Sequence, residues 1–379
     1  MSGGTGAAER AKRARLRSLA LRPARFDDYD KIRALLADYG LQSPPFDDWR
    51  HRWVDNPVWQ RLGGVSPIGW VLETPTGEIV GSIESIPTKY KFQGNDLVAS
   101  AGAALCVKTP YRRFALQLID EYFSQAVDLF ISTTIGPAAV STLSRFASPI
   151  PLGQWDKTSY FVTDHVSFAK RALQKWRLSP SPLLAYPFGW TLSLKDVLCN
   201  ALLPEPARDV LLEATDKFDS RFDVFWEQLV RENREKLLAD RSSQALWWHF
   251  DAAIRRNRLW IFTASKNGRL LGYCVLRQES MPGGASMRLI DYQNLDPDRD
   301  LLPGFLRMAL QRCIEKGFYM LQNVGVGVPK MRAFEEYAPY RGKLPNVVFF
   351  YNAADEKFKA ELGELRFWDP SLFDGDAAL

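Results

Sequence analysis

The sequence lacks the features that would place it in several common classes. Its four cysteines stand far apart in 379 residues and, with only three histidines, offer no metal-ligand spacing. We therefore expect no metal, and buried thiols in a reducing cytoplasm. No run approaches 18 uninterrupted apolar residues, and no apolar segment follows the N-terminal charges, which argues against a transmembrane helix and a secretory signal. Glycine-rich phosphate loops and the Gly-x-Ser-x-Gly elbow of hydrolases are also absent.

Excess positive charge is missing from most of the chain. Residues 1–25 carry seven basic side chains and one acidic one, whereas residues 26–379 carry 42 and 43. The net charge of +5 therefore belongs to a basic N-terminal tail, which we expect to be disordered or frayed. A wholly basic nucleic-acid-binding domain is disfavoured, so nucleic acid is not an expected partner. The length and a hydrophobic content of 46% predict two or three globular domains.

The chain resembles itself at an offset of about 191 residues. Phe26-Asp27 corresponds to Phe218-Asp219, and each pair opens an amphipathic helix. Hairpins with turns at Gly77 and Gly268 follow, and then strands and proline-led helices in the same order. The equivalent strands are 101–107 and 287–292, then 128–133 and 318–323, and finally 159–162 and 347–350. Nine ordered equivalences predict two repeats of about 140 residues.

The repeats divide the chain into five parts. We expect a tail at 1–25, domains at 26–165 and 216–353, a proline-rich connector at 166–215 and an acidic C-terminal tail at 354–379. The connector is predicted to contain one helix, at 192–203, and the C-terminal tail to be solvated.

This order of elements resembles the GNAT acyltransferase superfamily, in tandem, over 26–165 and 216–353. The resemblance implies an α/β (α+β) fold in which each repeat is a mixed, mostly antiparallel sheet flanked by helices, and one sheet runs continuously through both repeats. In that family the sheet splits beside its fourth strand. Acyl-CoA lies in the split, with its pyrophosphate on the N-terminus of the following helix. The implied substrate is acetyl-CoA or another acyl-CoA.

The phosphate-binding signature of the family is Arg/Gln-x-x-Gly-x-Gly/Ala, and the first repeat matches it in part. Arg112 stands at its first position, while Ala115 and Gln117 replace the small residues. An ordinary basic helix start is the alternative. Adjacent arginines oppose the helix dipole, however, and so favour an anion there. The cofactor-binding residues that the resemblance implies are Cys106, Val107, Tyr111, Arg112, Arg113, Phe114 and Ala115.

The second repeat has carboxylates where the first has arginines. Asp296, Asp298 and Asp300 stand at the corresponding loop, where they would repel a pyrophosphate. They suit the N-terminus of a helix that binds no phosphate. The sequence therefore predicts that acyl-CoA binds to the first repeat.

Three residues are candidates for catalysis. Ala333 and Tyr337 match the family pattern Asn-x-x-Ala-x-x-x-Tyr, which implies that Tyr337 protonates the leaving thiolate, whereas the first repeat has Phe146 at that position. Glu84, after a strand glycine, is a candidate general base, and Asp291, in an apolar strand, is another with a raised pKa. The alternatives are a core aromatic for Tyr337, a solvated carboxylate for Glu84 and a salt-bridged structural residue for Asp291.

The sequence leaves three functions open. The first is an N-acyltransferase that moves an acyl group from acyl-CoA to an amino group of a small molecule, with an amino sugar as one candidate acceptor. The second is a catalytically degenerate GNAT pair that serves as a binding or scaffold module. The third is a Fem-like transferase that takes aminoacyl-tRNA, which the basic tail would favour. The oligomeric state stays open in all three.

Overall fold

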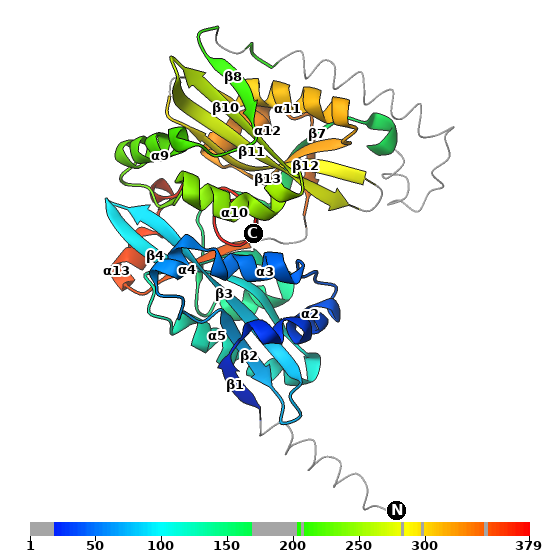
Figure 1. Cartoon of the computed structure of the whole chain (residues 1–379), viewed down its shortest axis with the longest axis vertical. Helices are drawn as coiled ribbons and strands as arrows, with labels where there is room; N and C mark the ends of the chain where they lie inside the picture. Colours follow the sequence, from blue (N-terminus) through cyan, green and yellow to red (C-terminus); the bar gives the residue numbers. More distant parts are fainter. Residues whose placement is uncertain (1–18, 169–202, 206–207, 282–283, 297–298, 345–347) are drawn as a thin grey trace, which may run out of the picture.

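The fold is built from two β-sheets, one above the other, with helices on their faces (Figure 1). A computed structural model describes residues 19–168, 203–205, 208–281, 284–296, 299–344 and 348–379. Cys199 and the predicted helix at 192–203, except Leu203, lie outside these residues. Within the described part of the chain, no helix is both long and apolar enough to cross a membrane.

The first sheet contains eight strands, mostly from the N-terminal half. Its helices include α2 (Tyr29–Ala37), α3 (Phe46–Val54) and α4 (Pro57–Arg61), and then η2 (Thr109–Phe114), α5 (Ala115–Phe123) and α6 (Pro137–Leu143); the short η1 (Phe26–Asp28) precedes them. The strands are, in spatial order, β1 (Ala20–Pro23), β2 (Gly69–Glu73), β3 (Ile79–Phe92), β4 (Asn95–Val107), β5 (Leu129–Ile135), β15 (Val348–Ala353) and β6 (Ser148–Pro149), with β9 (Leu238–Ala239) paired to the far end of β3.

The second sheet contains seven strands, mostly from the C-terminal half. The helices around it are α9 (Ser220–Glu232), α10 (Ser243–Arg255), α11 (Leu302–Lys316), η3 (Pro329–Met331) and α12 (Arg332–Tyr337). Its strands are, in spatial order, β14 (Tyr340–Lys343), β7 (Gln154–Val162), β13 (Met320–Val326), β12 (Gly284–Asn294), β11 (Arg269–Met281), β10 (Leu259–Lys266) and β8 (Leu211–Thr215).

The sequence pattern explains how several of these elements begin and end. Asp219 caps α9 by accepting a hydrogen bond from the Arg221 N–H, and Ser242 caps α10 in the same way from Ala245. Gly317 ends α11 with φ of +71°, a backbone conformation that glycine adopts without strain. Most of the repeat predicted from the sequence therefore follows local signals.

Two expectations about the sheets are wrong. The two sheets are separate, so no continuous sheet runs through both repeats. The closing strands are also exchanged: β7 pairs with β13 in the second sheet, and β15 pairs with β5 in the first. Where the two strands pass each other, the rings of Trp155 and Phe349 stack with centroids 3.9 Å apart. Each half therefore completes the core of the other.

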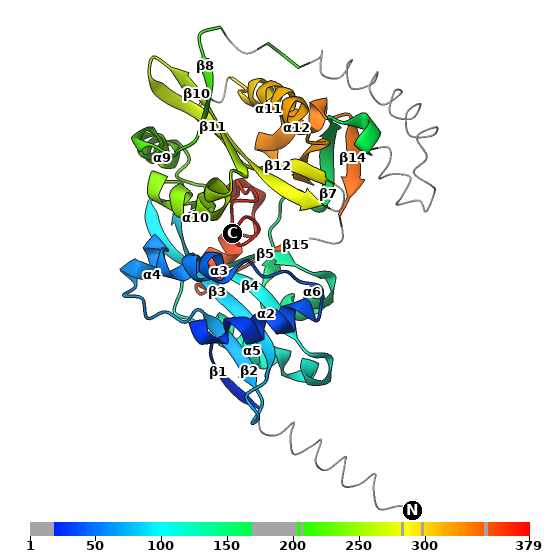
Figure 2. The same cartoon turned by 45° about the vertical axis from the view of Figure 1, so that its right-hand side comes forward.

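The ends of the chain are more ordered than the sequence suggested. Residues 20–23, within the predicted tail, form β1, and Arg22 pairs with Asp28 and Glu73. The expectation of a solvated C-terminal tail is wrong. After α13 (Glu356–Glu361) and η4 (Leu365–Phe367), the chain runs between the two sheets, and its side chains there are largely buried (Figure 2). The name "C-terminal segment" is used below for residues 369–379.

Both sheets split at the same place. β4 and β5 are parallel partners only over 99–101 and 129–131, and then diverge. In the second sheet, β12 and β13 pair only over 287–288 and 321–322. Each repeat therefore has one split between its parallel strands. The two repeats differ in which residues occupy that split.

Phe350→Ala tests the exchange of strands. Phe350, on β15, is 3% exposed and packs against Ile119 and Ile135 of the first half. We expect a loss of about 3–5 kcal/mol in the free energy of unfolding, measured by urea denaturation, because a large buried ring leaves a cavity. Val224→Ala, at an exposed position of α9, is the control and should change stability little.

Amide hydrogen exchange in the same variant locates the damage. Protection should fall in β5 more than in β13, because β15 pairs with β5. A greater loss of protection in β13 would contradict the exchange.

Candidate functional site

β4 carries a bulge beside its split. Ser82 of β3 faces Cys106, but Glu84 faces Ala103, so Ala104 and Leu105 together oppose one residue of β3. Ala104 has φ of +52°, in the left-handed region, which costs a non-glycine residue about 1–2 kcal/mol. A bulge of this kind interrupts the ladder of hydrogen bonds and re-aims backbone groups. The split thus has backbone on its β4 side that is not engaged in regular pairing.

Glu84 lies next to this bulge and is buried, so the alternative of a solvated carboxylate is wrong. Its carboxylate accepts a hydrogen bond from Trp49 Nε1 at 2.7 Å and pairs with Arg52 Nη1 at 2.9 Å. Arg52 also donates to the backbone oxygen of Leu379 at 3.2 Å. α3 thus holds both the carboxylate and the end of the C-terminal segment beside the bulge of β4.

The predicted cofactor-binding residues follow directly along the chain. Cys106 is buried, and burial raises the pKa of its thiol. Lys108 pairs with Glu78 at 2.9 Å and Asp38 at 3.4 Å, so acidic side chains already neutralise it. Tyr111, Phe114 and Ala115, which form the turn into α5, are half-buried, and Val107 precedes them at the end of β4.

Arg112 and Arg113 are exposed at the start of α5. Within the described chain neither has a carboxylate within ion-pair distance; the guanidinium of Arg113 lies 4.7 Å from the centre of the Phe114 ring. Two unneutralised cations at a helix N-terminus oppose the dipole of that helix unless an anion lies beside them.

The corresponding helix of the second repeat is already capped by its own acid. Asp300 accepts hydrogen bonds from the Leu302 N–H at 3.0 Å and from the Tyr292 hydroxyl at 3.4 Å. Burial raises the pKa of Asp300. The first residues of α11, from Leu302 to Leu306, are buried. Of the three acids in the predicted contrast, Asp298 lies outside the described residues.

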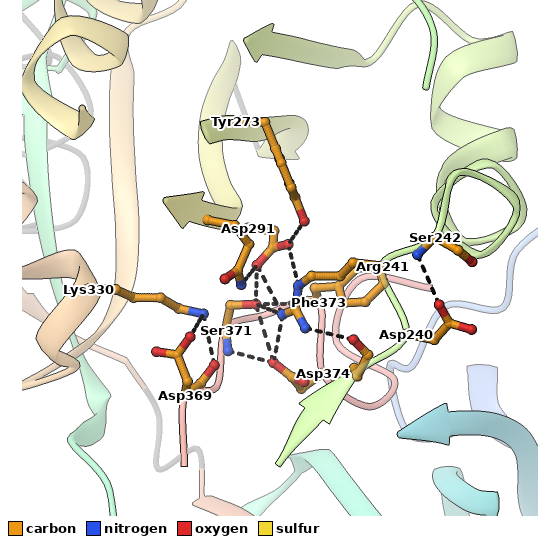
Figure 3. A network of polar contacts seen from close by, with 12 residues as sticks. Asp240, Arg241, Ser242, Tyr273, Asp291, Lys330, Asp369, Ser371, Phe373 and Asp374 are labelled. Atoms are coloured by element: carbon orange, nitrogen blue, oxygen red, sulfur yellow. Dashed lines mark hydrogen bonds and ion pairs between the residues drawn. The ribbon is translucent and has the colours of Figure 1, made fainter. Parts of the chain in front are cut away.

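Asp291 lies in a buried polar network between β12 and the C-terminal segment (Figure 3). It pairs with Arg241 at 2.8 Å and accepts hydrogen bonds from Tyr273 at 2.8 Å and Ser371 at 2.7 Å. Burial alone would raise the pKa of Asp291, but the charges of Arg241 and Lys330 and these hydrogen bonds outweigh it, and the pKa lies well below its usual range. A raised pKa is therefore wrong, and the structure agrees with a salt-bridged Asp291.

The same network closes the second split. Asp374 pairs with Arg241 at 3.4 Å and accepts from the backbone N–H of Ser371, while Lys330 pairs with Asp369 at 3.2 Å. Phe373 lies over the guanidinium of Arg241 at 4.8 Å. The C-terminal segment therefore fills the space that the second repeat would need for a ligand of the same kind.

The C-terminal segment then crosses to the first sheet. Asp376 accepts hydrogen bonds on one oxygen from the backbone N–H of Thr133, at 3.0 Å, and from its hydroxyl, at 2.8 Å. The Thr134 hydroxyl donates to the other oxygen of Asp376. These contacts lie on β5, beyond its pairing with β4, so the segment borders the first split while leaving the start of α5 exposed.

The structure brings together only part of the predicted site. Glu84 and the residues from Cys106 to Ala115 share the split side of the first sheet. Tyr337 ends α12 in the second half and is half-buried against the hydrophobic core there. No hydrogen bond or ion pair between described residues joins Tyr337 or Asp291 to Glu84.

Some residues of the site could not be identified from the sequence. No sequence motif marks Arg52, Arg241 or Ser371, because their partners stand 32, 50 and 80 positions away in the chain. Trp49 serves both as a core residue and as a donor to Glu84. The only signal in the sequence for the ion pair of Glu84 with Arg52 was that the two residues stand on a predicted strand and a neighbouring predicted helix.

The solved structures that this chain resembles include N-acyltransferase folds, three of which follow. A GCN5-related N-acetyltransferase from Anabaena variabilis ATCC 29413 matches 89% of this chain and 73% of its own, at 12% identity and a TM-score of 0.51. N-myristoyltransferase from Saccharomyces cerevisiae with bound myristoyl-CoA is 11% identical, with a TM-score of 0.50. The match covers 89% of this chain and 79% of the myristoyltransferase chain. A probable N-acyltransferase from Enterococcus faecalis V583 is 10% identical, with a TM-score of 0.52, and the match covers 89% of this chain and 73% of that protein's chain.

Sequence comparison with protein-family models and with curated proteins finds no match. At the identities above, the solved structures share the fold with this chain. The predicted fold class, two mixed sheets flanked by helices, is thereby confirmed.

The buried network predicts how stability depends on pH. Because the pKa of Asp291 is lowered on folding, its contribution is present above the unfolded value of about 3.9 and is lost as the pH falls further. Asp291→Asn should lose about 3–5 kcal/mol at pH 7, since Arg241 is left buried without its main partner, and should show a flatter decline in acid. Urea denaturation between pH 7 and pH 3 measures both effects.

Asp374→Asn is the matched control in the same network. Burial raises the pKa of Asp374, so this carboxylate opposes the acid decline. Its removal should leave the decline intact or make it steeper. Equal pH profiles for Asp291→Asn and the wild type would contradict the assignment.

Proposed function

We propose that this chain is an N-acyltransferase that moves an acyl group from acyl-CoA to the amino group of a small molecule, at the split of the first sheet. The observation that carries the proposal is the pair of exposed, unneutralised arginines, Arg112 and Arg113, at a helix start that follows a split and bulged strand. The solved structures with this fold include N-acetyltransferases and an N-myristoyltransferase bound to myristoyl-CoA, which supports acyl-CoA as the substrate class.

The phosphates of acyl-CoA would bind at the start of α5. Arg112 and Arg113 supply charge-assisted hydrogen bonds, and the helix dipole adds to the attraction. The pantetheine arm would run along the open edge of β4 toward the bulge at Ala104. The second split is filled by the C-terminal segment, so one acyl-CoA per chain is expected.

The reaction needs a base, an oxyanion site and an acid. The amine nitrogen attacks the thioester carbon, the C–S bond breaks, and an amide forms. Backbone N–H groups at the bulge of β4 would donate to the oxyanion of the tetrahedral intermediate. Glu84, beside Ala103, would take the proton of the amine, directly or through one water. The thiolate would take a proton from water, since Tyr337 packs against the core of the second half.

The acceptor is an amine, and an amino sugar is the acceptor class that we test first. A sugar amine presents its nitrogen beside hydroxyl groups, which suits the carboxylate of Glu84 and the guanidinium of Arg52. Glucosamine is the simplest probe of this class.

Acyl-CoA binding is tested by thermal unfolding. At a hundred times its dissociation constant, a ligand stabilises the native state by about 2.7 kcal/mol, which corresponds to roughly 5–11 °C in the midpoint. The double variant Arg112→Ala, Arg113→Ala should abolish the shift that acetyl-CoA or a longer acyl-CoA produces. Arg231→Ala with Arg234→Ala, a matched loss of two exposed arginines at the end of α9, should keep it.

Absence of any shift in the wild type with millimolar acyl-CoA of several chain lengths would overturn the proposal. In that case the scaffold function is favoured. Salt-dependent binding of tRNA instead would favour the aminoacyl-tRNA-dependent function.

Glu84→Gln tests the general base. We expect turnover to fall by about 10²-fold or more, since a positioned base contributes this much, while the acyl-CoA shift is retained. Release of free CoA thiol measures turnover. Glu121→Gln, at an exposed position of α5, is the control and should keep wild-type turnover. Unchanged turnover in Glu84→Gln would remove Glu84 from the mechanism, and the same assay on Tyr337→Phe decides its predicted role.

A further inference from the structure

Two arginines face each other on the second sheet, at the side of the C-terminal segment. Arg277 of β11 and Arg288 of β12 are direct register partners. Like charges opposite each other on neighbouring strands destabilise a sheet. Arg277 donates from Nε and Nη2 to Glu279 Oε1 at 3.1 Å, while Arg288 reaches the same oxygen only at 3.6 Å. Two cations therefore share one carboxylate, and the cluster carries a net positive charge.

The remaining contacts of Arg288 are neutral. With its amide oxygen turned toward Arg288, Gln322 of β13 accepts from Nε at 3.1 Å and from Nη2 at 3.0 Å. Burial lowers the pKa of Arg288, and the charge of Arg277 lowers it further, although Glu279 opposes both. The side chains of Arg277, Glu279 and Arg288 are still about a fifth to a quarter exposed. The cluster is thus partly desolvated yet accessible.

Two buried polar atoms near this cluster have no hydrogen-bond partner among the described residues. Ser286 Oγ belongs to a fully buried residue, which is the register partner of Glu279. His249 Nε2 belongs to a side chain that is 7% exposed. Burial lowers the pKa of His249 to about 3, and Arg277 is the neighbouring charge that lowers it most. Buried polar atoms without partners are rare in proteins, and a bound polar ligand is one way to satisfy them.

The arginine cluster lies near the proposed acyl-transfer site. Arg277 donates to the backbone oxygens of Ala377, at 3.2 Å, and Ala378, and Arg52 donates to the next one, that of Leu379. Consecutive Cα atoms are about 3.8 Å apart, and each carbonyl oxygen and hydrogen bond adds a few ångströms, so the two guanidinium groups lie within roughly 15 Å. A small molecule can span this distance.

We propose that Arg277 and Arg288 bind an anionic group of the acceptor, so that the acceptor is an amine that carries a phosphate or a carboxylate several bonds from its nitrogen. The amine would lie beside Glu84, and the anion would accept hydrogen bonds from the partly exposed guanidinium groups of Arg288 and Arg277. Such an anion would neutralise the charge that Glu279 leaves uncompensated. The inference rests on the proposed function for the identity of the substrate, and on the arginine cluster for the anion site.

Anion binding is tested first, without any reaction. In the double variant Arg112→Ala, Arg113→Ala, which lacks the other basic site, inorganic phosphate should raise the unfolding midpoint. Adding Arg288→Met should remove this rise, and Arg288→Lys should restore part of it. Arg269→Met, at an exposed position on the same strand as Arg277, is the matched control and should keep it. A rise that survives undiminished in Arg288→Met, or no rise in the double variant itself, overturns the proposal.

Acceptor choice is tested in the chain that retains Arg112 and Arg113. Glucosamine 6-phosphate should have a KM at least about tenfold below that of glucosamine. If a carboxylate is the preferred anion, the KM of β-alanine should be below the KM of β-alanine amide. Arg288→Met should raise the KM for the anionic acceptors about tenfold and leave the KM for acyl-CoA and the turnover of glucosamine unchanged.

The outcomes separate the two proposals. Equal KM changes for neutral and anionic acceptors would overturn the anion site while acyl transfer stands. A phosphate-dependent rise that needs Arg288, in a chain that transfers no acyl group, would support the anion site and overturn the proposed function. Arg288→Lys, which keeps the charge, separates loss of anion binding from a general loss of structure.

Discussion

One buried charge, that of Arg241, constrains much of the molecule. Its side chain is fully buried, and a guanidinium removed from water costs several kcal/mol unless it is surrounded by opposite charge and hydrogen-bond acceptors. Asp291 supplies one carboxylate from β12, and Asp374 supplies the other from the C-terminal segment, 83 residues further along the chain. The second sheet therefore cannot reach its stable arrangement until the last residues of the chain are in place.

This constraint determines which repeat remains open to a ligand. The acids that neutralise Arg241 bring Ser371 and Phe373 into the second split, and Asp300 caps the helix that would otherwise present free N–H groups to a phosphate. The first repeat has neither device at the start of α5. The two repeats thus have similar folds but differ in their polar groups. Those of the second repeat are bound to one another, whereas those at the start of α5 in the first repeat remain available to a ligand. The exchange of β7 and β15 joins the two frameworks, so the open split is held by strands from both halves.

Much of this fold could be predicted from the sequence, because the signals that specify it are local. Turn glycines, helix caps and hydrophobic periodicity lie within a few residues of one another, and they predict the repeat and most strands. The position of the split was implied only by the family resemblance. The exchange of β7 and β15 could not be predicted, since no local signal in either strand specifies which sheet it joins. The burial of Asp374 and Asp376 could not be predicted either, because an acidic sequence is typical of a solvated tail. Their partners, Arg241 and Thr133, are far away in the sequence. The candidate site divides in the same way. Arg112 and Arg113 follow from a local pattern, whereas the pairing of Glu84 with Arg52 depends on tertiary packing.

The position of the C-terminal segment connects these features. It begins at Lys330 of the second half, passes Arg241, reaches Thr133 on β5, and ends beside Arg277 and Arg52. A segment bound by two sheets at once fixes the distance between them, because any shift of one sheet against the other would break hydrogen bonds that are buried and cannot be replaced by water. The proposed reaction needs this rigidity: the thioester would be held by the first sheet and the anion of the acceptor by the second. A misplacement of about 1 Å can cost about 10²-fold in rate, so the proposed reaction would depend on the spacing of the two sheets. The segment that closes the second split would thus also align the acceptor with the acyl donor.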